Sequence, residues 1–318
     1  MRGRRTKLSA RWVVGHRDAR HCLLRNGEVV FEGDRVVFVG HGFPGEVEER
    51  RDYGIALIAP GFVDLDALGD LDTTVLGFDN QPAWRKGRVW PRSYVERGPY
   101  EMCSPEELAF QKRYAFAQLL LNGITRALPI ASLFYREWGE TTAEFSAAAT
   151  AAGELGLRVY LGPADRSGGL VVEDDERIVP VFDEARGLRG LEEAIAFCQA
   201  YEGTQEGLVR TMLAPDRIET CTPELLRRTA DAGRSLDVPV RLHCCQSRLE
   251  VDMVLQRYGM SPPEWLASLG FLSPRSLLPH GTWVSGSRGM PQTGCDLEII
   301  RDAGATIVHW CRRAAVGH

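Results

Sequence analysis

From Ile55 onward, short apolar segments alternate with longer segments of helical periodicity, and this alternation leaves the chain few possible folds. The expected strands begin at residue 55 and continue at 124–130, 157–161, 207–213, 238–243, 276–280 and 305–309. Between them, helices are expected near 104–121, 142–155, 190–201, 222–236, 248–269 and 294–303. Strands alternating with helices indicate a parallel sheet, and this many favour a closed TIM-like (β/α) barrel over a doubly wound sheet. Because the sequence provides seven such strands and a closed barrel needs eight, we predict a barrel that is incomplete at its C-terminus.

The first part of the chain has a different pattern. Residues 8–58 consist of short alternating runs separated by turn residues, which predicts a small antiparallel β domain. Asn26-Gly27 is a strong hairpin signal because both residues tolerate positive φ, and Gly33-Asp34 is expected to form a second turn. We therefore predict a β domain at 1–58 and a barrel at 59–318.

Composition and charge exclude several classes of protein. The chain has 318 residues, 44% of them hydrophobic and 25% charged, which is ordinary for a globular protein. A net charge of −5 argues against a nucleic-acid or anionic-membrane partner, and no apolar run is long enough to span a membrane. The eight cysteines are scattered without a disulfide or zinc-knuckle spacing, so we expect a cytoplasmic protein.

Candidate functional residues are those that finish the predicted strands, because a barrel places its active site at the C-terminal strand ends. Three successive strands end in histidine, although the chain has only 7 histidines, and this predicts a convergent polar site. The candidates are Asp64, Asp66 and Asp70 after the first strand, Asp216 after the fourth, and His243, His280 and His309 at the last three.

Several motifs resemble one known family in order and spacing. They are Ala59-Pro-Gly-Phe-Val63, Val238-Pro-Val-Arg-Leu-His243, Pro279-His280-Gly281 and Ala305-Thr-Ile-Val-His309. Over roughly residues 20–309 the sequence is similar to the amidohydrolase superfamily, particularly its deaminase and chlorohydrolase branch. The resemblance implies a TIM barrel that uses a bound metal to hydrolyse C–N or C–Cl bonds. It also implies that residues 1–58 are half of a composite, sandwich-type β domain, completed in the family by strands from the far C-terminus.

The resemblance also implies roles for individual residues. It makes Asp66 and His243 ligands of a divalent metal (Zn, Fe or Mn), with Asp66-Ala67-Leu68 standing where the family has His-x-His. His280 and Gln246 would be catalytic, Gln246 replacing a glutamate that moves protons in the family. The family's last ligand, an aspartate ending the eighth strand, has no counterpart here, and residues 310–318 read as foreign to the fold.

Three functional hypotheses follow. The first is an amidohydrolase-like hydrolase that acts on a small N-heterocycle through metal-activated water, as a deaminase or chlorohydrolase. The second is a catalytically silent or truncated relative that binds a ligand or has no function. The third is metal-free hydrolysis by the carboxylates after the first strand with help from His280. The sequence leaves a homo-oligomer open.

Each candidate also has a purely structural interpretation. The aspartates after the first strand suit solvated turns and caps, and Cys244 and Cys245 suit buried structural thiols. The loop over 72–102 carries aromatic and basic residues that suit either a lid over a ligand or a surface excursion.

Overall fold

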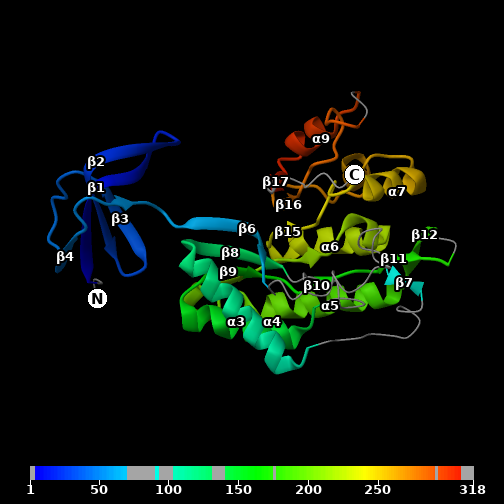
Figure 1. The fold of residues 1–318 in the computed structure, drawn as a ribbon, viewed down its shortest axis with the longest axis horizontal. Coiled ribbons are helices and arrows are strands. Elements are labelled where there is room, and N and C mark those ends of the chain that lie inside the picture. The colour runs from blue at the N-terminus through cyan, green and yellow to red at the C-terminus, as the bar shows by residue number, and fades with distance from the viewer. Residues whose placement is uncertain are drawn as a thin grey trace. The chain divides into compact units, whose positions relative to one another are not determined.

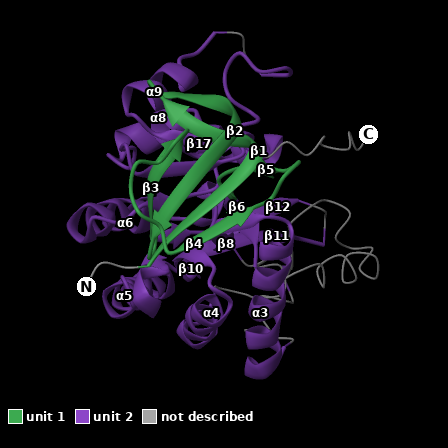
Figure 2. Cartoon of the chain, turned by 90° about the vertical axis from the view of Figure 1, so that its left-hand side faces the viewer, with its two compact units in different colours: residues 1–62 green, residues 63–318 purple. Residues whose placement is uncertain are grey.

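The computed structural model describes residues 4–69, 90–92, 103–130, 140–174, 177–290 and 293–308. It divides into two compact units, Met1–Phe62 and Val63–His318, which are coloured separately in Figure 2. The predicted division fell after residue 58.

Unit 1 is a five-stranded sheet in which three strands form a meander. Its strands are β1 (Arg5–Arg17), β2 (Arg20–Glu32), β3 (Arg35–Gly40), β4 (Glu49–Asp52) and β5 (Leu57–Ile58). β1, β2 and β3 pair antiparallel, as expected for alternating runs joined by tight turns. β4 and β5, however, both pair parallel to β1, so the sheet is mixed and not wholly antiparallel.

The turns of unit 1 correct one sequence prediction and confirm another. Asn26-Gly27 does not form the hairpin; it lies inside the continuous strand β2, where Asn26 takes a φ of 54°. The turn is at Asp18-Ala19, whose φ values of 51° and 58° are those of a two-residue turn that matches the twist of the strands. The positive φ of Asn26 therefore produces an irregularity within β2 and not a turn. Gly33 and Asp34 form the second turn as predicted, between Glu32 and Arg35.

Unit 2 carries seven strands that neighbour one another in chain order. They form two sheets, β13-β9-β8-β6 and β15-β16-β17, which a parallel bridge between Leu213 and Val240 connects. The strands are β6 (Phe62–Leu68), β8 (Ile124–Ile130), β9 (Arg158–Leu161), β13 (Val209–Thr211), β15 (Val240–Arg241), β16 (Ser276–Pro279) and β17 (Thr306–Val308). The order never reverses, which is the winding of a barrel and not that of a doubly wound sheet. Within the described ranges no pairing joins β17 to β6.

Helices follow these strands, as Figure 1 shows. They are α3 (Pro105–Leu121), α4 (Thr142–Leu155), α5 (Glu184–Tyr201), α6 (Pro223–Leu236), α7 (Arg248–Tyr258), α8 (Pro262–Ser268) and α9 (Asp296–Asp302), with 3-10 turns η3 (Gln205–Gly207) and η4 (Ile218–Thr220). α3 begins as the sequence predicts: Ser104 and Glu107 form a reciprocal capping box and Pro105 occupies the first turn. α5 begins six residues earlier than expected, at an Asp183 N-cap.

Further short strands lie in the loops between the main elements. They are β7 (Trp90–Pro91), β10 (Ala164–Asp165), β11 (Gly168–Val172), β12 (Ile178–Phe182) and β14 (Ala214–Pro215). β11 and β12 form an antiparallel hairpin, and β10 pairs parallel with β14.

The core of unit 2 lies between its strands and helices. One cluster includes Phe116 of α3, Phe145 of α4 and Phe197 of α5, all at most 1% exposed. Each such side chain contributes roughly 1.5–3 kcal/mol through removal from water. A second cluster joins α5 to α9 through residues such as Leu226 and Leu278. This packing fixes the strand ends where the candidate site lies.

Candidate metal centre

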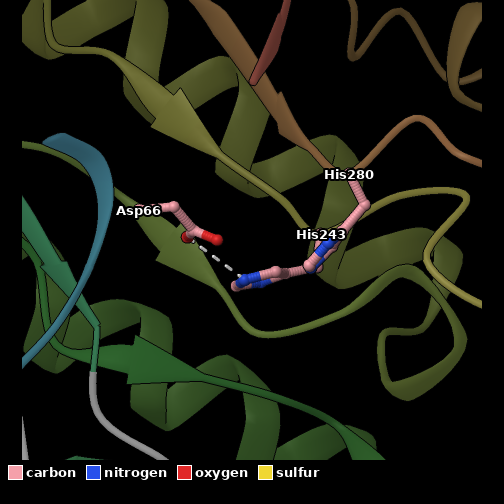
Figure 3. A group of neighbouring side chains, drawn as sticks. All are labelled: Asp66, His243 and His280. Carbon is pink, nitrogen blue, oxygen red and sulfur yellow. Dashed lines mark ion pairs between the residues drawn. The ribbon is translucent and has the colours of Figure 1, made fainter. Parts of the chain in front are cut away.

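Three of the predicted side chains come together at the strand ends of unit 2. Asp66 lies in β6, His243 follows β15, and His280 follows β16 directly. One potential ligand atom from each lies within 4.8 Å of the other two. Figure 3 shows the three side chains reaching toward one another from separate segments of the chain. All three are nearly buried, at 8%, 9% and 8% exposure respectively.

A hydrogen bond to the main chain orients His243. Its Nδ1 lies 2.8 Å from the carbonyl oxygen of Asp216, and a carbonyl can only accept, so Nδ1 carries the proton and donates. The other nitrogen, Nε2, is then free to act as a ligand and lies 3.4 Å from Asp66 Oδ1. This arrangement, in which an outer hydrogen bond selects the tautomer, is common for metal-binding histidines.

His280 is held in an unusual backbone conformation. Its φ is 80°, which L-residues rarely adopt and which costs of order 1–3 kcal/mol. Its N–H donates to the carbonyl of Val308 at 2.9 Å, which ties the residue to β17. Its ring centroid lies 5.3 Å from that of His243. Strain of this kind is typical of functional positions.

The electrostatic surroundings keep Asp66 ionised. Burial alone would raise the pKa of this carboxyl, but contact with His243 and the charges of His243, Arg241 and His280 outweigh it and lower the pKa. Oδ1 of Asp66 is buried and makes no hydrogen bond within the described part of the chain. An anionic oxygen left without a hydrogen bond in a buried site is expensive unless a cation is present.

These observations fit a divalent metal. Ligand atoms on a tetrahedral metal with bonds of about 2.0–2.1 Å lie about 3.3–3.4 Å apart. The 3.4 Å between Asp66 Oδ1 and His243 Nε2 matches that separation and is longer than a good N–H···O hydrogen bond. A carboxylate with two imidazoles is a donor set that Zn, Fe and Mn accept.

Arg241 belongs to the same surroundings, although sequence reasoning missed it. Its side chain is buried, and Nη1 donates to the carbonyls of Leu128 and Pro129 at 2.9 and 3.2 Å. Burial lowers its pKa, while the negative charge of Asp66 favours the charged form. The available signal was its spacing, because a residue two positions before His243 on a strand faces the same side.

Gln246 lies on the segment that leads into α7. Its N–H donates to Glu250 Oε2 at 2.8 Å, and the N–H of Cys245 donates to Oε1 of the same carboxyl group. Burial and the nearby charge of Glu219 raise the pKa of Glu250 to about 8, against the lowering effect of these backbone donors. Cys244 and Cys245 are both buried free thiols.

Of the other candidates, Asp64 and Asp216 lie within the described residues. Asp64 accepts a hydrogen bond from the N–H of Asp66 at 3.1 Å, which is the turn-type role expected of a structural aspartate. Asp216 pairs with Arg217 at 3.4 Å. Asp70, His309 and nearly all of the 72–102 loop lie outside the described residues.

Comparison with known proteins decides the family. The model of the amidohydrolase family matches residues 58–316, which is most of the chain. The chain belongs to this family. The resemblance to its deaminase and chlorohydrolase branch is also confirmed, because the curated relatives that it matches are deaminases.

Two curated relatives illustrate the similarity. The 5-methylthioadenosine/S-adenosylhomocysteine deaminase 2 of Archaeoglobus fulgidus is 33% identical over 165 residues, covering 51% of this chain and 34% of that protein. The 5-methylthioadenosine/S-adenosylhomocysteine deaminase of Natronomonas pharaonis is 25% identical over 289 residues, covering 90% of this chain and 58% of that protein. The chain thus spans about a third to three fifths of the length of these relatives.

Solved structures support the fold. Atrazine chlorohydrolase of Arthrobacter aurescens, complexed with zinc, superimposes with a TM-score of 0.70 at 20% identity, covering 96% of this chain and 65% of that one. An adenosine deaminase of Xanthomonas campestris with bound zinc gives a TM-score of 0.65 at 18% identity, covering 96% and 62%. The fold is TIM-barrel-like, as predicted. Among the described helices, none has both the length and the apolarity needed to cross a membrane.

Proposed function

We propose that this chain is a metal-dependent hydrolase that cleaves a C–N or C–Cl bond of a small N-heterocycle. The observation that carries the proposal is the grouping of Asp66, His243 and His280 within 4.8 Å, with a buried carboxylate oxygen that lacks a hydrogen bond. The deaminases and the chlorohydrolase to which the chain is similar support this reaction class. In the overall reaction water adds at a ring carbon, and either ammonia or chloride with a proton is released.

In this proposal Asp66 and His243 hold the metal. A divalent metal supplies a water molecule whose pKa is lowered toward neutrality, together with a positive charge beside the reacting carbon. Asp66 is suited to this role because its pKa is lowered and it remains anionic at neutral pH. Zn, Fe and Mn are all compatible, because each accepts carboxylate and imidazole ligands.

His280 and Gln246 are proposed to act on the substrate. His280 can exchange a proton with the leaving group, because an imidazole ring can both donate and accept a proton. Gln246 has no titratable proton, so its amide would orient the substrate by hydrogen bonds while the proton moves elsewhere. Leu68, at 40% exposure, stands where a second metal-binding imidazole is expected from the family pattern and cannot bind metal.

The remaining parts of the proposal concern organisation. Residues 59–318 would form the hydrolase barrel, and residues 1–58 half of a composite β domain. We propose a small-molecule substrate, a cytoplasmic location, and neither a nucleic-acid nor a membrane partner; a homo-oligomer stays open.

The test is the metal content of the purified chain by elemental analysis, with Asp66→Ala plus His243→Ala as the variant. Asp252→Ala is a matched control, because that carboxylate is exposed and pairs only with Arg248 among the described contacts. We expect near-stoichiometric metal in the wild type and the control and little in the double variant. Ammonia release from aminated heterocycles and chloride release from chlorotriazines should follow the same order. Absence of metal in all three proteins would contradict the proposal and favour the silent relative.

A further inference from the structure

A cavity beside η4 is separate from the candidate metal centre. Its volume is about 380 Å³, which is within the range of small-molecule sites. Its walls come from β12, η4 and the second half of α7, and Figure 1 shows β12 and α7 at the same side of unit 2. The apolar lining includes Ile178, Pro180, Ile218 and Val254. None of Asp66, His243 and His280 lines it.

Two polar atoms of the lining residues lack hydrogen bonds. Glu219 Oε2 and Tyr258 Oη are both buried, and neither has a hydrogen-bond partner within the described ranges. The side chain of Glu219 is only 6% exposed. A buried polar group without its hydrogen bond is destabilising, so a ligand that donates to these atoms would recover that free energy.

The carboxylate of Glu219 is an acceptor that suits a cationic donor. Glu219 Oε1 lies 3.5 Å from Arg217 Nη1, and Arg217 also pairs with Asp216 at 3.4 Å. Asp216 also pairs with Arg166 at 3.5 Å, so two guanidiniums face these two carboxylates. The charge of Glu219 also raises the pKa of the neighbouring Glu250. Arg257, the cation among the lining residues, is exposed, and its guanidinium lies over the ring of Phe182 at 4.3 Å. On the buried side of the cavity, the acceptor available to a ligand donor is therefore Glu219 Oε2.

We propose that this cavity binds a small aromatic amidine or amine, with its ring among the apolar side chains and its N–H groups donated to Glu219. A flat ring suits walls made of Ile178, Pro180, Ile218 and Val254. A planar amidinium can give two parallel hydrogen bonds to a carboxylate, which is the strong geometry for such pairs. An anionic ligand would be repelled by the carboxylate of Glu219 and could not donate to it.

One hydrogen bond connects the wall of the cavity to the backbone of the candidate metal centre. The N–H of Ile218 donates to the carbonyl of His243 at 3.1 Å, so η4 separates the cavity from the backbone that carries His243. A test of the cavity must therefore distinguish a ligand bound there from one bound at the metal centre.

The experiment titrates the full chain with benzamidine by isothermal calorimetry. Acetophenone is the matched probe, because it has the same size and shape but no N–H donor. We expect saturable one-to-one binding of benzamidine and at least tenfold weaker binding of acetophenone. Glu219→Gln should weaken benzamidine binding about tenfold, and Ile178→Trp, which fills the cavity from β12, should remove it. Asp66→Ala should leave the dissociation constant unchanged.

Glu224→Gln is the control for loss of a carboxylate, because Glu224 is exposed on α6 and pairs with Arg228. Circular dichroism melts establish that each variant is folded, and Ile178→Trp alone carries the test if Glu219→Gln unfolds. The proposal is overturned by the absence of saturable binding or by equal affinity for the two probes. It is also overturned if Asp66→Ala abolishes binding, or if folded Glu219→Gln or Ile178→Trp binds benzamidine as the wild type does.

Discussion

Asp165 is a buried carboxyl group that should make the folded chain less stable as the pH rises. It ends β10, is 4% exposed, and neither of its oxygens has a hydrogen-bond partner within the described ranges. Burial, with a further contribution from the charge of Asp216, raises its pKa from 3.8 to about 7, although its own backbone N–H acts in the opposite direction.

The sign and size of the effect follow from proton linkage. Below about pH 4 both folded and unfolded chains keep the Asp165 proton, so there is no penalty. Between about pH 4 and 7 the unfolded chain loses the proton more easily, and stability falls as pH rises. A difference between 3.8 and about 7 corresponds to about 4 kcal/mol, reached above pH 7.

Asp165→Asn removes the ionisation while keeping the shape of the side chain. We expect its stability relative to the wild type to rise by about 3 kcal/mol between pH 5 and pH 8. Urea denaturation at both pH values measures this, and the comparison between pH values cancels the cost of burying the amide itself. Asp231→Asn is the control, because its side chain is 73% exposed, and it should show no such change. A stability difference for Asp165→Asn that does not change with pH would refute the reasoning.

Three further predictions concern buried contacts. Lys112→Met should destabilise the chain by about 3–5 kcal/mol in chemical denaturation, because it leaves two buried carboxylates without the cation that lies 3.0 and 3.6 Å from them. The exposed neighbour Arg113→Met should cost less than about 1 kcal/mol, and equal effects would contradict the argument. Gly162→Ala should lower the melting temperature, because its Cβ would lie 2.2 Å from the carbonyl oxygen of Met212; an unchanged melt would show that the backbone adjusts freely. Arg241→Met should raise the pKa of Asp66, measured by carboxyl carbon NMR, because it removes a positive charge that lowers that pKa. No change would mean that the guanidinium does not act on Asp66.

Much of the fold was predictable because its signals are local. The capping box of Ser104 and Glu107 and the glycine that ends α4 at Gly156 depend on neighbours a few residues away. The winding of unit 2 was predictable because strand–helix alternation permits few topologies. The hairpin prediction at Asn26-Gly27 failed because positive φ is a property of single residues, and the sheet decides whether it makes a turn or an irregularity.

The sequence by itself determined the order of the elements and which side chains finish the strands. Hydrophobic periodicity and the signals that end a helix or strand depend on residues close together in the chain. The sequence also identified Asp66, His243 and His280 as candidates, because parallel strands end at the same edge. Only the tertiary structure decided that one ligand atom from each of these three side chains lies within 4.8 Å of the other two. It alone also decided that the buried guanidinium of Arg241 donates to the carbonyl of Leu128. The same is true of the unsatisfied carboxyl groups of Asp165 and Glu219. Distances and desolvation arise from packing between segments far apart in the chain, and no local pattern specifies them.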